Sequence, residues 1–313
     1  MIRLPSTGIA KCVKVHRVDL MIFCDWIEAS ALFVEADVSG SDLVDILVKN
    51  NIYSEQSFAW EFVNDALSNL DVRSRLIGEG YPFSITSDTV SSKGTWQDYT
   101  PYAFCLMLSL AKSHSSWVRT FGANFTVQGE LFEKLTAEAV SLTLPGWTVF
   151  PTGWSRTQTA RIKQVVENIC NQMNEAAGEI FRWTRDTAKE AGLDLITYRS
   201  FADGNAGVPI YLWQCASGMD WVGKRKTPDL ALWGRLVQWP VIPKKAMAMP
   251  FALSEQDMAL HSNIIEGLLL DRHRLLEPGL DNRDWVSAGL RTEIINWLTP
   301  RITGLPILEL AAV

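Results

Sequence analysis

One segment constrains the fold of this chain more than any other: GLDLITYRSFADGNAGVPIYLWQCASG, residues 192–218. Near its end Tyr211 and Trp213 share one face of an extended strand, while Ile210 and Leu212 share the other. A strand that is apolar on both faces is buried on both sides. DLITY predicts a second strand, and the intervening DGNAG combines residues that accept positive φ in turns. The segment therefore predicts a buried β-hairpin.

Polar residues stand at the open end of this hairpin, where folding alone does not require them. Asp194 shares a strand face with Ile196 and Tyr198, a costly place for an unpaired charge. Gln214 lies on the second strand, and a turn centred near Gly204 would bring it close to Asp194. We therefore expect a polar pair at the end of the hairpin.

An amphipathic helix is predicted before the hairpin, in GELFEKLTAEAVSLTL at residues 129–144. Its apolar stripe consists of Leu131, Leu135, Ala139 and Leu142. Glu133 has Ala137 and Val140 one and two turns further on, so its carboxylate leans toward the edge of that stripe. Glu133 is therefore a candidate to join the polar pair, although a solvated helix acid would show the same spacing.

The chain divides into two predicted domains. Residues 1–125 have helical spacing and no recognisable chemistry, which indicates a mainly helical accessory domain with a loop over Gly78–Tyr99. Residues 126–313 alternate helices and strands, which predicts an α/β domain. Within it we expect a helical insertion at about 157–190 and a helical tail after Ser254.

The composition indicates a globular protein of the cytoplasm. The chain has 313 residues, 47% of them hydrophobic, and no apolar run approaches the roughly 20 residues needed to cross a bilayer. Met1–Ala10 lacks a signal-peptide pattern, and five cysteines, odd in number and set among apolar neighbours, suit a reducing compartment. We expect neither export nor membrane insertion.

Net charge is −6, which argues against a free-standing, tight nucleic-acid binder because phosphate affinity comes mostly from clustered Lys and Arg. The charge is uneven, since the segment from Trp221 to Lys245 carries one acid, Asp229, among six basic residues. These are Lys224, Arg225, Lys226, Arg235, Lys244 and Lys245. A local basic edge therefore remains on an acidic body.

Several chemistries lack their sequence signatures. The four histidines show no HExxH spacing, and neither GxxxxGK[ST] nor a GxGxxG after a strand occurs. Ser217 follows a strand, but Cys215 occupies the place of the first glycine of GxSxG. A zinc protease, an NTPase, a dinucleotide enzyme and a serine hydrolase are therefore disfavoured.

The order of a helix with Glu133, a strand with Asp194, a strand with Gln214, and then a helix and a further strand resembles the restriction-endonuclease-like superfamily of PD-(D/E)xK nucleases. GELFEKL, GLDLI and YLWQCASG carry the resemblance. It implies a restriction-endonuclease-like mixed sheet flanked by helices and a Mg²⁺- or Mn²⁺-dependent endonuclease, a hydrolase of DNA more than of RNA. It further implies metal ligation by Glu133, Asp194, Gln214 and the carbonyl of Cys215.

The chain departs from that family pattern at two positions. The pattern has an acid at position 214 and a lysine at 216, where this chain has Gln214 and Ala216. An amide carbonyl can still ligate a metal, with one negative charge fewer. A lysine would help to activate water and offset charge on the phosphate. Lys224 and Lys226 lie in the loop after the strand, and Lys224 is predicted to take this role.

Two alternatives stay open beside the nuclease. The missing lysine and the acidic charge favour a nuclease-derived subunit without catalysis that binds DNA or acts as a scaffold, with 13 tryptophans available for a protein interface. The third is an unrelated α/β interaction module in which the polar residues never meet. Under the nuclease hypotheses the resemblance implies a prokaryotic restriction or antiphage defence system, with a partner subunit or a homo-oligomer.

Overall fold

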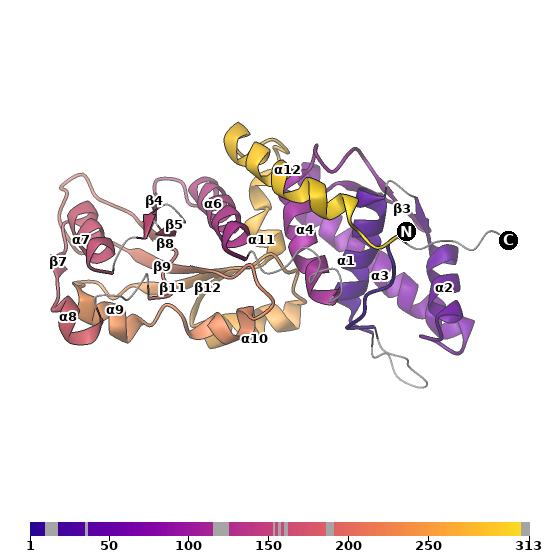
Figure 1. Ribbon diagram of the computed structural model, residues 1–313, viewed down its shortest axis with the longest axis horizontal. Helices are drawn as coiled ribbons and strands as arrows, with labels where there is room; N and C mark the ends of the chain where they lie inside the picture. The colour runs from indigo at the N-terminus through magenta and orange to yellow at the C-terminus, as the bar shows by residue number, and fades with distance from the viewer. Residues whose placement is uncertain are drawn as a thin grey trace. The chain divides into compact units, whose positions relative to one another are not determined.

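The computed structural model describes residues 1–9, 18–34, 37–114, 125–152, 154–155, 158–159, 162–185 and 191–307. The chain forms two compact units (Figure 1). The first, here called the helical unit, comprises residues 1–124, 250–252 and 276–313. The second, here called the sheet unit, comprises residues 125–249 and 253–275. The tail from Leu276 thus groups with the helical unit, whereas the sequence assigned it to the second domain.

A five-stranded mixed sheet forms the centre of the sheet unit, in the order β12-β11-β9-β8-β4. Strand β8 pairs antiparallel with β4 and with β9, whereas β11 pairs parallel with β9 and with β12. The strands are Thr148–Pro151 (β4), Leu195–Tyr198 (β8), Ile210–Cys215 (β9), Lys244–Ala248 (β11) and Gly267–Leu270 (β12). A mixed open sheet flanked by helices confirms the α/β class.

The predicted hairpin is confirmed. Strands β8 and β9 pair antiparallel with Leu195 opposite Trp213, which sets Asp194 beside Gln214. Strand β9 lies between β8 and β11, so neither of its edges is open. Trp213 is 0% exposed and donates its ring N–H to the Thr197 hydroxyl across the strands. Burial of both faces is therefore achieved without leaving the indole N–H unsatisfied.

Helices cover both faces of the sheet (Figure 1), with α6 (Phe125–Thr143) on one side and α9 (Leu230–Leu236) and α10 (Glu255–Ile265) on the other. The predicted apolar stripe of α6 is buried except for Leu142, which is 53% exposed in the last turn. Buried residues from α7 (Ile162–Met173) and α9 pack together on Ile196 and Leu212 of the sheet. The core of this unit therefore includes the inserted helix.

The described part of the insertion is less helical than predicted. Helices are expected over 157–172 and 174–189; the first corresponds to α7, which begins at Ile162, and the described part of the second contains the short α8 (Ile180–Trp183), with 186–190 outside the described residues. Before it, β7 (Ala176–Ala177) pairs antiparallel with β10 (Val237–Gln238). The same pairing ends α9 at Leu236, although the sequence predicts a helix to about Gln238. Backbone hydrogen bonds between two short segments outweigh helix propensity here.

The helical unit also contains a small sheet that the sequence did not predict. Strands β1 (Val38–Ser39), β3 (Thr89–Ser92) and β2 (Phe83–Ile85) form it in this order, so part of the expected loop over 78–99 is extended. Two 3₁₀ helices, Gly78–Gly80 (η1) and Glu277–Gly279 (η3), lie in the same unit. Its long helices are Leu20–Phe33 (α1), Gly40–Lys49 (α2), Gln56–Ile77 (α3), Thr100–Ser113 (α4) and Ala288–Thr303 (α12). The described elements of this unit are mostly helices.

The tail predicted as helical contains a strand. GLLL forms β12 beside β11 because Leu269 and Leu270 are buried there. Further on, α12 packs on α4, with the Phe104 and Trp297 rings edge to face at 5.2 Å between centroids. Within the described part of the chain, no helix combines the length and apolar character that crossing a membrane requires.

Candidate active site

The carboxylate of Asp194 lies at the edge of the sheet where β8 begins and β9 ends. Its Oδ2 accepts the backbone N–H of Cys215 at 2.5 Å and the side-chain N–H of Gln214. The backbone of Asp194 is fixed as well, since its N–H donates to Trp213 O at 2.9 Å and its carbonyl accepts the Thr152 N–H at 3.1 Å. The predicted pairing of Asp194 with Gln214 is thus present, with the amide nitrogen toward the carboxylate.

The other end of the Gln214 amide contacts Thr227, a residue for which the sequence predicts no role in the site. Thr227 Oγ1 lies 2.9 Å from Gln214 Oε1 and 2.6 Å from the Lys224 carbonyl oxygen. Gly192 lies beside Thr227 and has a φ of +73°, and a Cβ there would lie 3.2 Å from Thr227 Cβ. Glycine is required at 192 both for its backbone conformation and for the space.

The Cys215 thiol shows which charged groups surround the strand end. Burial raises the pKa of Cys215 well above its usual value, and the negative charges of Asp194 and Glu133 raise it further. A hydrogen bond with Thr136 and the positive charge of Lys224 act in the opposite direction on this pKa. Glu133 from α6, Asp194 and Lys224 therefore all lie within electrostatic range of one sulfur. The thiol itself is held neutral and is no nucleophile.

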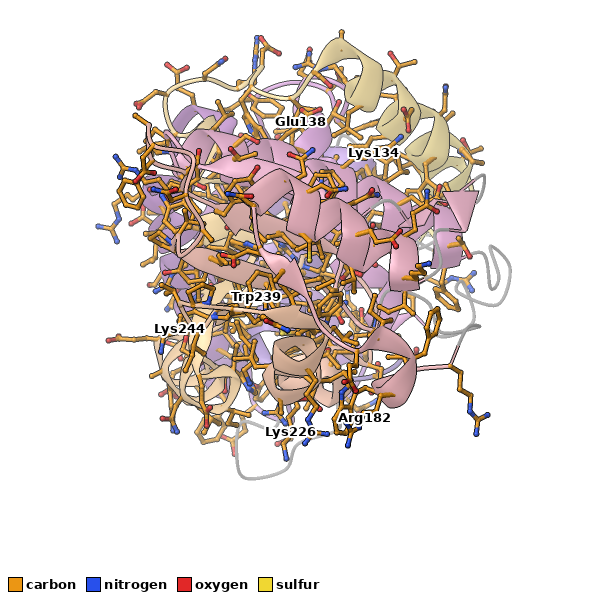
Figure 2. The ribbon with its side chains drawn as sticks, turned by 90° about the vertical axis from the view of Figure 1, so that its left-hand side faces the viewer. Lys134, Glu138, Arg182, Lys226, Trp239 and Lys244 are labelled. Atoms are coloured by element: carbon orange, nitrogen blue, oxygen red, sulfur yellow. The ribbon has the colours of Figure 1, made fainter. Side chains whose placement is uncertain are left out.

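Lys224 belongs to the 3₁₀ helix η2 (Trp221–Lys226), on which Lys224 and Lys226 are both exposed. The helix is anchored to α10 by Trp221, whose ring meets the His261 ring at 4.6 Å between centroids, and by Arg225, 3.0 Å from the same histidine. Figure 2 shows Lys226 at the outer edge of the sheet unit, and its side chain is exposed.

Oxygen donors dominate the proposed metal set: two carboxylates, the Gln214 amide carbonyl and the Cys215 backbone carbonyl. These are the hard ligands that Mg²⁺ accepts. Among the described residues no group of three or more His, Cys, Asp or Glu side chains is placed to hold a metal ion. Gln214 also points its nitrogen at Asp194, so ligation requires its amide to turn over. The donor types fit a divalent cation, and the amide has the same shape in either orientation.

The basic residues of the insertion face solvent where they are described. Lys163, Arg182 and Arg185 are exposed, while Arg156 and Arg161 lie outside the described residues. Arg182 pairs with Glu179 at 3.1 Å, and Figure 2 shows it at the edge of the sheet unit. None of these contacts connects the insertion with Asp194.

Comparison of the chain with protein-family models, with curated proteins and with solved structures finds no match. The resemblance to PD-(D/E)xK nucleases therefore depends on the chain's own residues and their arrangement.

Proposed function

We propose that the chain is a metal-dependent nuclease that hydrolyses phosphodiester bonds in DNA. The observation that carries the proposal is the hydrogen bond between Gln214 and Asp194 at the end of β9, with Glu133 and Lys224 within electrostatic range of the neighbouring Cys215 thiol. Two acids, an oxygen-bearing amide and a lysine at one strand end suit phosphoryl chemistry. The element order around them, from α6 through β4, β8 and β9 to α9 and β11, supports a restriction-endonuclease-like fold.

Glu133, Asp194, Gln214 and the Cys215 carbonyl would hold Mg²⁺ or Mn²⁺. Such an ion, when bound, polarises the phosphoryl group and lowers the pKa of water. Asp194 is the fixed member of the set, because two N–H groups hold its carboxylate. Lys224 would offset negative charge that develops on the phosphate, and the neighbouring basic residues of η2 would attract the DNA backbone.

The test is cleavage of supercoiled plasmid DNA and of single-stranded RNA by purified protein in Mg²⁺ and in Mn²⁺. We expect DNA cleavage that Asp194→Ala abolishes. Asp203→Ala is the matched control, since Asp203 is an exposed turn residue whose carboxylate accepts the Asn205 N–H. Cleavage of RNA alone would reassign the substrate. Equal cleavage by Asp194→Ala and the wild type would refute the proposed site.

A second candidate function is a nuclease-derived subunit without catalysis that binds DNA or supports a partner protein. Ala216 favours it, because this buried residue stands where the family pattern has lysine. Titration calorimetry with Mg²⁺ separates the two, since the non-catalytic subunit predicts no binding. In either form the resemblance supports a role in prokaryotic restriction or antiphage defence in the cytoplasm.

A further inference from the structure

The hydroxyl of Thr227 has a single proton, and it lies within hydrogen-bonding distance of two oxygen atoms. Its Oγ1 lies 2.6 Å from the Lys224 carbonyl oxygen and 2.9 Å from Gln214 Oε1. A threonine hydroxyl donates once. One of the two contacts therefore brings oxygens together without a hydrogen bond between them. The Lys224 carbonyl already accepts the Thr227 backbone N–H at 2.9 Å, so both arrangements of the hydroxyl proton are available.

Turning the Gln214 amide over would satisfy every group around Thr227. The amide nitrogen would then donate to Thr227 Oγ1, and the hydroxyl would donate to the Lys224 carbonyl. At the opposite end of the amide, Oε1 would face the carboxylate oxygen of Asp194 that now accepts the amide N–H. Two oxygens in that contact repel each other, and a cation between them removes the repulsion.

We propose that Thr227 is a positioning residue that favours the metal-binding orientation of the Gln214 amide. This inference rests on the proposed function and adds a link between metal binding and the loop of Lys224. With no cation the amide nitrogen stays on Asp194. With a cation the amide turns, and the Thr227 hydroxyl holds both the amide nitrogen and the carbonyl of Lys224.

Mg²⁺ titration calorimetry of Thr227→Val tests this role without any measurement of cleavage. The hydroxyl can make one hydrogen bond while the amide stands as it does, and two after the amide turns: one from the amide nitrogen and one to the Lys224 carbonyl. Its removal should weaken Mg²⁺ binding about two- to tenfold, the value of one neutral hydrogen bond. Thr227→Ser keeps the hydroxyl and should bind as the wild type does. Thr143→Val is the matched control, because that hydroxyl donates to carbonyls of its own helix.

A double-mutant cycle with Gln214→Glu isolates the amide. A carboxylate has no N–H and the same atoms at both ends, so Thr227→Val should leave Mg²⁺ affinity unchanged in that background. An equal loss in both backgrounds, or no loss in either, overturns the role of Thr227. Failure of the wild type to bind Mg²⁺ overturns the proposed function itself, and this inference with it.

A spectroscopic measurement covers the case in which Thr227→Val does not fold. The side-chain NH₂ resonances of Gln214 in the wild type, assigned with the Gln214→Glu variant, should shift when Mg²⁺ is added because the amide changes partners. Mg²⁺ binding with unchanged Gln214 side-chain resonances overturns the inference.

Discussion

Each unit of the molecule contains a set of two acidic residues and a basic residue. The two sets differ in whether the basic residue is buried or exposed. In the helical unit Arg73 Nη1 lies 2.7 Å from Asp25 Oδ1 and 2.9 Å from Glu28 Oε2. Exposure is 1% for Arg73, 4% for Asp25 and 0% for Glu28. Burial alone lowers the pKa of Arg73, yet the two carboxylates raise it well above its usual value. We call these three residues the Arg73 cluster.

In the sheet unit Lys224, the basic residue of the proposed site, is exposed on η2, while Glu133 and Asp194 are half-buried. Asp194 accepts its two short hydrogen bonds from an amide and a backbone N–H. A buried cation fixed to both acids stabilises a fold and leaves no place for another ion. The Asp194 carboxylate accepts hydrogen bonds from two neutral N–H groups in the same unit as the exposed Lys224, which suits the proposed binding of a cation and a phosphate. A buried base therefore suits a structural role, whereas an exposed base suits the proposed function.

The largest effect is expected when the cation of the Arg73 cluster is removed. Arg73→Met leaves two buried carboxylates without their cation and should lower the free energy of unfolding by about 3–5 kcal/mol. Chemical denaturation measures it. Arg75→Met is the control, because the Arg75–Asp71 pair on the same helix is exposed and should contribute under about 1 kcal/mol. Equal stabilities of the two variants would show that the Arg73 cluster is not structural.

The second prediction concerns Lys224, the basic residue of the proposed site. Lys224→Ala should lower the rate of DNA cleavage roughly 10²-fold, because a charge that acts on the reacting phosphate is lost. Its free energy of unfolding should change by no more than about 0.5 kcal/mol, since the side chain is exposed. Lys226→Ala, in the same 3₁₀ helix, should lower the cleavage rate far less, because Lys226 is proposed only to attract the DNA backbone. Equal losses in both variants would make the lysines a general phosphate-binding surface.

The third prediction concerns Gly192, which lies beside Thr227. Gly192→Ala forces a side chain into φ +73° and against Thr227, and should cost about 1–3 kcal/mol of stability and weaken Mg²⁺ binding. Gly234→Ala is the control with the opposite sign, because Gly234 lies in α9 with open space beside it. Alanine should stabilise that helix by about 0.5–1 kcal/mol. Thermal unfolding and calorimetry give both quantities.

The sequence predicted the hairpin and its polar end because strand alternation and turn residues are local signals. The pairing of Asp194 with Gln214 follows from register alone. Strand β12 was missed because GLLL shows no alternation of apolar and polar residues. Its partner β11 is also separated from it in the chain by α10, so the pairing leaves no local signal. Thr227 was missed for a related reason: its contact with Gln214 joins two side chains through a loop, which no spacing rule reports.

The smallest expected effect tests whether the anchor of the Lys224 loop depends on pH. Burial, and then the charge of Arg225, lower the pKa of His261 below its ordinary value of about 6.5, whereas Asp257 raises it. The unfolded chain therefore binds a proton more readily than the folded one. The stabilisation is complete above about pH 6.5 and is lost as pH falls through the lowered pKa.

Protonation would also remove the lone pair of His261 that faces the Arg225 guanidinium. We expect a small fall in the thermal midpoint between pH 7.5 and pH 5 that is reduced in His261→Gln, which keeps an acceptor and does not titrate. An identical pH dependence in the variant would assign the fall to other groups.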